Sequence, residues 1–288
     1  MKIAIMTDEL SSDLETALEI GTDWGIRHYE IRGVGTERIG SLSPYGKHHL
    51  FQTIERFGVS VAALSPGVFK IPLLDPEVPE GFQVLRWQDV EEYHLRRNAL
   101  QKLEDHLNIV LPETIDIAKR LGVKIIVIFG VVRPEGTSAK DCPDIVVDLL
   151  REAAKKAAEA DITLALENEH ICFADNAVNS VRLIDKVGHP NLRLNWDPAN
   201  AYYAGEDPYP YGYSFVKDYV AHVHFKDAIT EPNGKRRYVV EGEIRWEDQL
   251  RALLSDGYDG FVTIETHCRP KIKSAKATLD RIRRVLEE

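Results

Sequence analysis

The sequence predicts a single (β/α)₈ barrel, the TIM-barrel fold, over residues 1–288. Amphipathic helical stretches alternate with short β-rich runs along the chain, and eight such runs fit into its 288 residues. Strict alternation favours parallel strands joined by right-handed crossovers. An open doubly wound sheet can also hold eight strands, but no GxGxxG motif follows the first run, which removes one reason to expect that fold.

Each expected strand follows a helical stretch and a small turn containing Gly, Asp or Pro, and each ends in polar residues. In the helix before the fifth strand, for example, Val146, Leu150 and Ala153 recur at helical spacing. The segment "SAKATLDRIRRVLEE" is the expected closing helix. The eight expected strands cover residues 2–7, 27–32, 59–65, 124–130, 162–167, 192–197, 220–226 and 261–266.

One stretch, residues 66–108 between the third and fourth strands, breaks this alternation. It contains "PGVFKIPLLDPEVPEGF" followed by a charged helical segment. A connection of this length in a compact domain is often an active-site lid. An extra surface helix without an active role explains the pattern equally well, so both interpretations stay open.

Composition narrows the class of protein. The chain is 44% hydrophobic and 28% charged, as is usual for soluble proteins, and its net charge of −10 argues against nonspecific binding to nucleic acid. The opening "MKIAIMTDEL" is too short and too soon acidic for a signal peptide, and no apolar run approaches the roughly 20 residues of a membrane helix. Three cysteines without a CxxC pair, Cys142, Cys172 and Cys268, predict free thiols in a reducing cytoplasm.

Four consecutive strands end in side chains that can bind a metal: Glu167, Asp197, His224 and Glu265. Within each strand they alternate with the apolar residues, so they are expected to point toward the barrel axis. The carboxyl ends of barrel strands meet at one rim, where three carboxylates would repel one another unless a cation compensates them. One imidazole and three carboxylates suit Mn²⁺, Mg²⁺, Co²⁺ or Zn²⁺. The alternative is that these residues cap helices or form salt bridges.

The motifs "LALENEH", "NWDPAN", "HVHFKD", "VEGEIRWEDQL" and "GYDGFVTIETH" occur in that order. In order and spacing they resemble the xylose isomerase-like barrels, in particular the sugar phosphate isomerase/epimerase branch with its tagatose 3-epimerase-like enzymes, inosose dehydratases and hydroxypyruvate isomerases. The resemblance covers essentially the whole chain. It implies one divalent metal ion, held by the four residues named above, and a sugar or polyol substrate. It also implies homodimers or homotetramers.

The resemblance implies a mechanism in which Glu167 and Glu265 act as acid and base, and a metal-stabilised enediolate forms from a ketose-type substrate. His170 could shuttle a proton or contact the substrate, or could have no role. Lys226 shares the inward parity of His224 and could neutralise an oxyanion or a substrate anion. A salt bridge to a neighbouring glutamate is an equal alternative for Lys226.

Four further residues are candidates for substrate binding. Glu30, with Arg32, ends the second strand and could hold hydroxyl groups, although an internal ion pair explains both residues as well. Arg133 follows the fourth strand, and Glu243 lies in a turn that family members use near the site. Asn200 stands where tagatose epimerase-like and apurinic endonuclease-like relatives have a histidine, and an amide is a poor metal ligand.

Three classes of function follow from these observations. The first is an isomerase or epimerase of a ketose-type sugar in carbohydrate metabolism, with manganese as one candidate ion. The second is a lyase that eliminates water from a keto-sugar or inosose after the same proton abstraction. The third is an apurinic endonuclease-like repair enzyme, or a barrel that only binds sugar. The acidic charge and Asn200 argue against repair.

Overall fold

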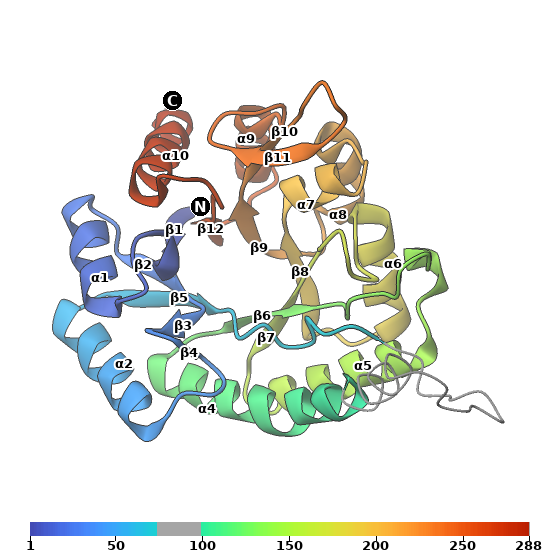
Figure 1. Ribbon diagram of the computed structural model, residues 1–288, viewed down its shortest axis with the longest axis horizontal. Helices are drawn as coiled ribbons and strands as arrows, with labels where there is room; N and C mark the ends of the chain where they lie inside the picture. Colours follow the sequence, from blue (N-terminus) through green and yellow to red (C-terminus); the bar gives the residue numbers. More distant parts are fainter. Residues whose placement is uncertain (74–98, 288) are drawn as a thin grey trace, which may run out of the picture.

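The computed structural model describes residues 1–73 and 99–287, and within them eight parallel strands close into a barrel (Figure 1). Around the barrel the strands are adjacent in the order β1, β12, β9, β8, β7, β6, β5 and β2. The predicted fold class is therefore confirmed, and every expected strand is present, shortened by one or two residues. The bounds are β1 Lys2–Met6, β2 His28–Ile31, β5 Ser60–Leu64, β6 Ile125–Phe129, β7 Thr163–Glu167, β8 Leu192–Trp196, β9 Val220–Phe225 and β12 Phe261–Ile264.

Helices surround this barrel on the outside, as Figure 1 shows. They are α1 Leu14–Asp23, α2 Pro44–Phe57, α4 Leu111–Leu121, α5 Asp144–Ala158, α6 Ala177–Val187, α7 Pro198–Tyr203, α8 Tyr213–Val216, α9 Trp246–Ser255 and α10 Lys271–Leu286. Short helical turns lie at Thr7–Glu9, His106–Val110, Ala139–Asp141 and Pro208–Gly212. Within the described part of the chain, no helix has both the length and the apolar character needed to cross a membrane.

Helix ends explain why the chain turns so quickly from helix to strand. Gly122 and Gly188 follow α4 and α6 with φ of 70° and 64°, a left-handed conformation that costs glycine little. Their amide groups bond back to carbonyls of the last helical turn. The next strand therefore starts three or four residues later, at Ile125 and Leu192, as the short turns in the sequence predict.

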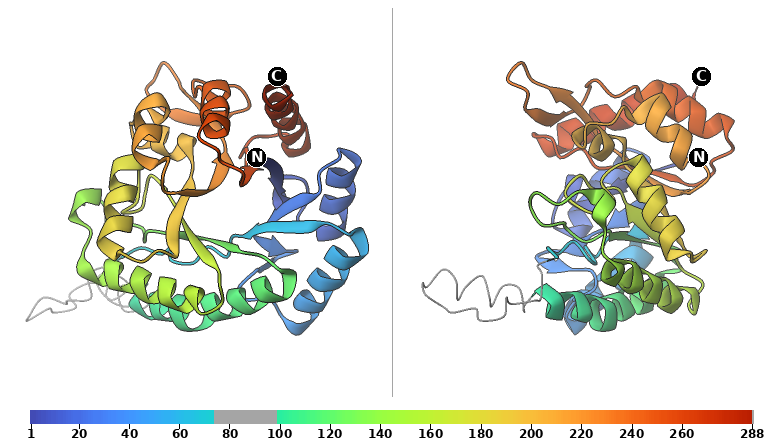
Figure 2. Two further views of the ribbon diagram at one scale, coloured as in Figure 1. Left: turned by 180° about the vertical axis from the view of Figure 1, so that it is seen from behind. Right: turned by 90° about the vertical axis from the view of Figure 1, so that its right-hand side faces the viewer.

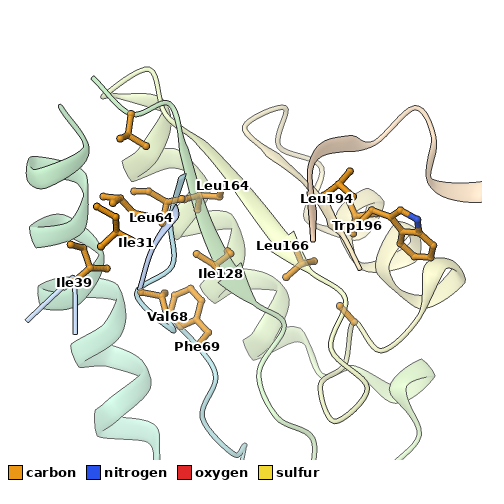
Figure 3. Close-up of a cluster of buried hydrophobic side chains, with 14 of the residues drawn as sticks. Ile31, Ile39, Leu64, Val68, Phe69, Ile128, Leu164, Leu166, Leu194 and Trp196 are labelled. Carbon is orange, nitrogen blue, oxygen red and sulfur yellow. The ribbon is translucent and has the colours of Figure 1, made fainter. Parts of the chain in front are cut away.

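The alternation of side chains separates two apolar layers. Leu164, Leu166, Leu194 and Trp196 point outward from β7 and β8 and pack in the large core between the strands and the helices (Figure 3). The inward positions form a much smaller cluster inside the barrel, made of Ala63, Val127 and Ala165 with Ile125 packed against it. Small inward residues leave the barrel's carboxyl-terminal end to polar groups.

Two hairpins were not among the expected strands. The hairpin of β3 (Gly33–Val34) and β4 (Glu37–Arg38) follows β2, and the hairpin of β10 (Asp227–Thr230) and β11 (Arg236–Val239) follows β9. Figure 2 shows the second, in orange, projecting from the barrel. Both belong to loops that follow barrel strands, where active sites of this fold are built. Of the long connection expected at 66–108, residues 74–98 lie outside the described part of the chain.

We expect Leu166→Ala to lower the free energy of unfolding by about 2–5 kcal/mol, because Leu166 is fully buried in the outer core and its loss leaves a cavity. Denaturant unfolding followed by circular dichroism measures the change. Ile145→Ala, at a position 50% exposed, serves as control and should change stability by less than about 0.5 kcal/mol. Equal losses in the two variants would contradict the assignment of Leu166 to the core.

Candidate metal centre

Four side chains with metal-binding atoms meet at the carboxyl-terminal end of the barrel. Glu167 is the last residue of β7, Asp197 follows β8, His224 lies near the end of β9 and Glu265 follows β12. Each offers one ligand atom, and these atoms lie within 4.8 Å of one another. All four side chains are buried, with at most 3% of the residue exposed. We call these four residues the carboxylate–histidine cluster.

Asp197 combines two functions that the sequence left as alternatives. Its Oδ1 atom accepts hydrogen bonds from the backbone amides of Ala199, at 2.9 Å, and Asn200, at 3.1 Å, and so caps the first turn of α7. Its Oδ2 atom faces the cluster, where the Asn200 side-chain amide donates to it at 3.0 Å. The cap therefore fixes the orientation in which the second oxygen reaches the cluster.

The two glutamates differ in their surroundings. The amide of Asn200 donates to Glu167 Oε1 at 3.1 Å, and the amide of Asn195 donates to Glu167 Oε2 at 3.3 Å. Glu265 Oε1 instead accepts from the guanidinium of Arg32 at 2.8 Å. Burial alone would raise the pKa of Glu265, but the charges of Lys226 and Arg32 hold it well below its usual value. Lys226 contacts both glutamates, but Glu265 has a second cation, Arg32, where Glu167 has neutral amides.

Glu30 lies beneath the cluster and orients its histidine. The Glu30 carboxylate is 3.0 Å from His224 Nε2 and 2.8 Å from Nε2 of His222, and the Ser65 hydroxyl donates to it. With Nε2 of His224 bonded to Glu30, its Nδ1 atom faces Glu265 Oε2 at 3.1 Å and Glu167 Oε2 at 3.4 Å. A carboxylate behind a histidine in this way fixes the ring for metal binding. Glu30, His222 and His224 also lie close enough for a metal site, but their hydrogen bonds to one another already account for them.

Lys226 supplies a positive charge at the cluster. Its Nζ atom lies 2.7 Å from Asp197 Oδ2, 2.7 Å from Glu265 Oε2 and 3.3 Å from Glu167 Oε1. Burial would lower the pKa of Lys226, but these carboxylates hold it well above its usual value. The backbone carbonyl of Lys226 accepts from the indole of Trp246 at 2.6 Å, which fixes the main chain at this point.

The donor set fits a divalent ion. His224 Nδ1 is buried without a hydrogen-bond partner among the described residues, and three carboxylates point oxygens at the same space. One nitrogen and three oxygens suit Zn²⁺, Mn²⁺, Co²⁺ or Mg²⁺. A divalent ion held there would bind the same three carboxylates that the Lys226 ammonium contacts. The ion and this ammonium therefore compete for the cluster.

Of the remaining candidate residues, Asn200 and His170 lie in or near the cluster, whereas Arg133 and Glu243 contact residues outside it. Asn200 lies in the cluster itself, between Glu167 and Asp197. His170 is nearby, with Nδ1 2.9 Å from Glu169 Oε1. Arg133 pairs with Asp175 at 3.2 Å and donates to the carbonyl of Cys172, so it stabilises the loop after β7. Glu243 is exposed and accepts from the hydroxyl of Tyr202.

A cavity of about 270 Å³ opens over the cluster, and part of its lining was missed from the sequence. His267, with a left-handed φ of 53°, reaches within 3.4 Å of Glu265 Oε1. It lies beyond the end of β12 and of the expected strand, where the alternation of strand side chains does not apply, so no strand pattern predicted it. Lys70 pairs with Glu169, and no pattern in its loop predicted this. Burial would raise the pKa of Glu169, but the contacts with His170 and Lys70 hold it at about 2.

Four rings from four different loops form a chain beside this cavity. His170 lies 5.1 Å from Tyr203, Tyr203 stacks on Tyr238 at 4.7 Å, and Tyr238 is 5.2 Å from His267, measured between ring centroids. The Tyr238 hydroxyl is 3.5 Å from Oδ1 of Asn200. The ring chain thus joins the loops after β7, β8, β9 and β12 around the cluster.

A family model matches most of this chain, and one curated relative matches less than half of it. The model of a family described as xylose isomerase-like TIM barrel matches residues 22–285. The 3-dehydroshikimate dehydratase of Bacillus anthracis is 24% identical over 135 residues, and the match spans 41% of this chain and 47% of that relative.

Solved structures extend the likeness to the entire chain. The IOLI protein, solved with a zinc atom, is 16% identical with a TM-score of 0.74, and the match covers 100% of this chain and 98% of that one. A D-tagatose 3-epimerase-like protein is 18% identical with a TM-score of 0.71, covering 100% and 98%. At these identities the structures show a shared fold.

We expect Lys226→Met to destabilise the chelator-treated protein by about 3 kcal/mol, because the variant leaves three buried carboxylates without their cation. With a divalent ion bound the loss should be much smaller, and the variant should bind the ion at least about tenfold more tightly, since the competing ammonium is gone. Thermal unfolding with and without metal, and metal titration by calorimetry, measure both effects. Lys235→Met, at an exposed position in the turn between β10 and β11, is the control. Equal destabilisation with and without metal would show that Lys226 does not compete with the ion.

Proposed function

Because the chain belongs to the xylose isomerase-like TIM-barrel family, we propose that it is a divalent-metal-dependent isomerase or epimerase of a ketose-type sugar or sugar derivative. The observation that supports this most directly is the carboxylate–histidine cluster, which brings one imidazole and three carboxylates together at the floor of a cavity. The epimerase-like structural relative has the same fold.

A divalent ion in the cluster would act as a Lewis acid, withdrawing electrons from a carbonyl of the substrate and so acidifying the neighbouring C–H bond. The chain's own carboxylates then move the proton. Glu167 is the better candidate for the base, because Lys226 contacts both glutamates but only Glu265 is also paired with Arg32, whereas the other donors to Glu167 are the neutral amides of Asn195 and Asn200. Glu265 completes the pair: it takes up a proton from water in the cavity and returns it to the substrate on the opposite side, and Glu167 releases to water the proton that it removed.

Other residues support this chemistry from fixed positions. Asn200 holds Glu167 and Asp197 at a constant separation by donating to both. Lys226, once released from the carboxylates by the ion, provides an ammonium group for negative charge that develops on the substrate. His170, oriented by Glu169 at 2.9 Å, is proposed to shuttle a proton at the cavity or to contact the substrate. The prediction that Glu30, Arg133 and Glu243 contact the substrate is not tested by the structure.

A lyase is the second candidate, and the curated relative favours it, because that relative is a dehydratase. Elimination and isomerisation both begin with removal of the proton beside a carbonyl. They differ in whether a leaving group stands on the next carbon. In a lyase the group that protonates the departing hydroxyl would be Glu265 or His170.

We further propose that the protein works in the cytoplasm on a small sugar or polyol, as a homodimer or homotetramer, within carbohydrate metabolism. Three thiols, Cys142, Cys172 and Cys268, are unpaired in the structure, which agrees with a reducing compartment.

Metal content tests the centre directly. The purified protein should contain about one divalent ion per chain by elemental mass spectrometry, and Glu265→Gln or Asp197→Asn should lower that occupancy by about 10-fold or more, because each removes a charged ligand. Glu241→Gln, at an exposed glutamate outside the cluster, should keep the full content. Full occupancy in both cluster variants would place the ion elsewhere.

Proton transfer tests the reaction. In D₂O, with the bound ion retained, the protein should incorporate deuterium beside the carbonyl of a ketose from a panel of fructose, tagatose, allulose and keto-inositols. Glu167→Gln should slow this exchange by about 10²–10⁴-fold, because the base is removed. Nuclear magnetic resonance follows both exchange and products. Retention of every oxygen identifies an isomerase or epimerase, and loss of one water identifies the lyase. Exchange at the wild-type rate in Glu167→Gln would rule out Glu167 as the base.

A further inference from the structure

The wall of the cavity opposite the cluster carries positive charge. In barrel order, β7, β8, β9 and β12 hold the cluster, whereas β5 and β2 are neighbours on the far side. Three basic side chains from the loops after those strands line the same cavity: Arg32 and Arg38 after β2, and Lys70 in the loop after β5. The cavity therefore has three cations on this wall, and none of them is among the four residues of the cluster.

Arg38 lacks an anionic partner. Arg32, the other guanidinium in the cavity, is paired with Asp8 at 3.1 Å and with Glu265 at 2.8 Å. The side chain of Arg38 makes neither a hydrogen bond nor an ion pair with the residues that the structure describes, and it is exposed along this cavity and an adjoining one. An unpaired guanidinium offers a planar fork of donors that matches the oxygens of a carboxylate or phosphate.

The backbone that carries Arg38 is firmly held. The next residue, Ile39, is fully buried, and its amide donates to the carbonyl of Arg32 at 3.1 Å. The preceding residue, Glu37, accepts from the backbone and hydroxyl of Ser43 at 2.7 and 2.9 Å. At Gly33, which pairs with Arg38, a Cβ atom would meet the carbonyl oxygen of Glu37 at 2.4 Å. The hairpin thus presents Arg38 from a tightly packed base.

Lys70 is held in a similar way and keeps donors free. Phe69 before it is buried in a left-handed conformation, with φ of 65°, and its amide donates to His106 Nδ1 at 2.9 Å. The Lys70 ammonium lies 4.6 Å from the centre of the Phe129 ring and pairs with Glu169. An ammonium has three donors, and the Lys70 side chain is 41% exposed, so it can bind a second anion without giving up Glu169.

Arg38 is the cation of this wall without an anionic partner. Asp8 pairs with Arg32, and Glu169 pairs with Lys70. No ion pair joins Arg38 to any residue that the structure describes, and its side chain is exposed at the cavity. A substrate with an anionic group would supply the partner that Arg38 lacks.

We propose that Arg38 and Lys70 form an anion subsite, so that the substrate is a keto-sugar derivative bearing a carboxylate or a phosphate, bound with its carbonyl toward the cluster and its anionic group toward the loops after β2 and β5. This proposal rests on the proposed function, because it assigns a substrate class to that site. It adds two residues that determine specificity without touching the reacting carbon.

Calorimetric titration of the metal-loaded protein with two matched pairs of probes tests the subsite. The pairs are D-fructose 6-phosphate against D-fructose, and D-glucuronate against D-glucose. At least one charged probe should bind about tenfold or more tightly than its neutral partner, which corresponds to about 1.4 kcal/mol. A preference confined to the first pair identifies a phosphate, and one confined to the second identifies a carboxylate.

Arg38→Gln and Lys70→Met should each remove most of that preference while leaving the weak affinity for the neutral probe unchanged. Arg27→Gln, at another exposed arginine, located just before β2, is the matched control and should bind as the wild type does. If both variants kept the preference for the charged probe, the anion would bind elsewhere, for example at the metal ion, and the proposal would be wrong. Equal or undetectable binding of the charged and neutral probes to the wild-type protein would also overturn it. Metal content measured on the same samples separates these outcomes from failure of the proposed function, because Arg38→Gln and Lys70→Met leave the cluster intact.

Discussion

The structure depends on one electrostatic constraint: three carboxylates are buried at one point, where they would repel one another without a cation. Glu167, Asp197 and Glu265 lie within reach of a single positive centre, and Lys226 contacts all three. Arg32 donates to this group on one side, and Asn195 and Asn200 donate on the other. The cap of α7 and the histidine held by Glu30 fix the geometry that this constraint requires.

The barrel and the cluster were predictable because both follow from a repeating local pattern. Strand parity placed Glu167, Asp197, His224 and Glu265 on the inward face, and in a closed barrel all inward strand ends meet. His267 lies beyond the end of β12 in a left-handed conformation, so the same argument does not reach it. Asp197 shows that capping and participation in the cluster need not exclude each other, because a carboxylate has two oxygens and uses one for each.

Residues in long loops could not be placed in this way. Arg133 follows a barrel strand, as a substrate contact often does, yet it pairs with Asp175. Lys70 stands in a loop with no periodic pattern, and its pairing with Glu169 joins positions 99 residues apart in sequence. Only tertiary packing decides such partners, since loop backbones lack the fixed side-chain period of strands and helices. The hairpins after β2 and β9 were missed for the same reason.

The four residues of the cluster come from strands that are consecutive around the barrel, whereas the loops after β2 and β5 form the opposite wall. The proposed catalytic groups and the proposed anion subsite therefore belong to separate arcs of one ring of loops. The hairpin after β2 or the loop that carries Lys70 could change without replacing any residue of the carboxylate–histidine cluster. Substrate preference could in this way change one loop at a time on a constant barrel, since loop variation is what lets this fold support many functions.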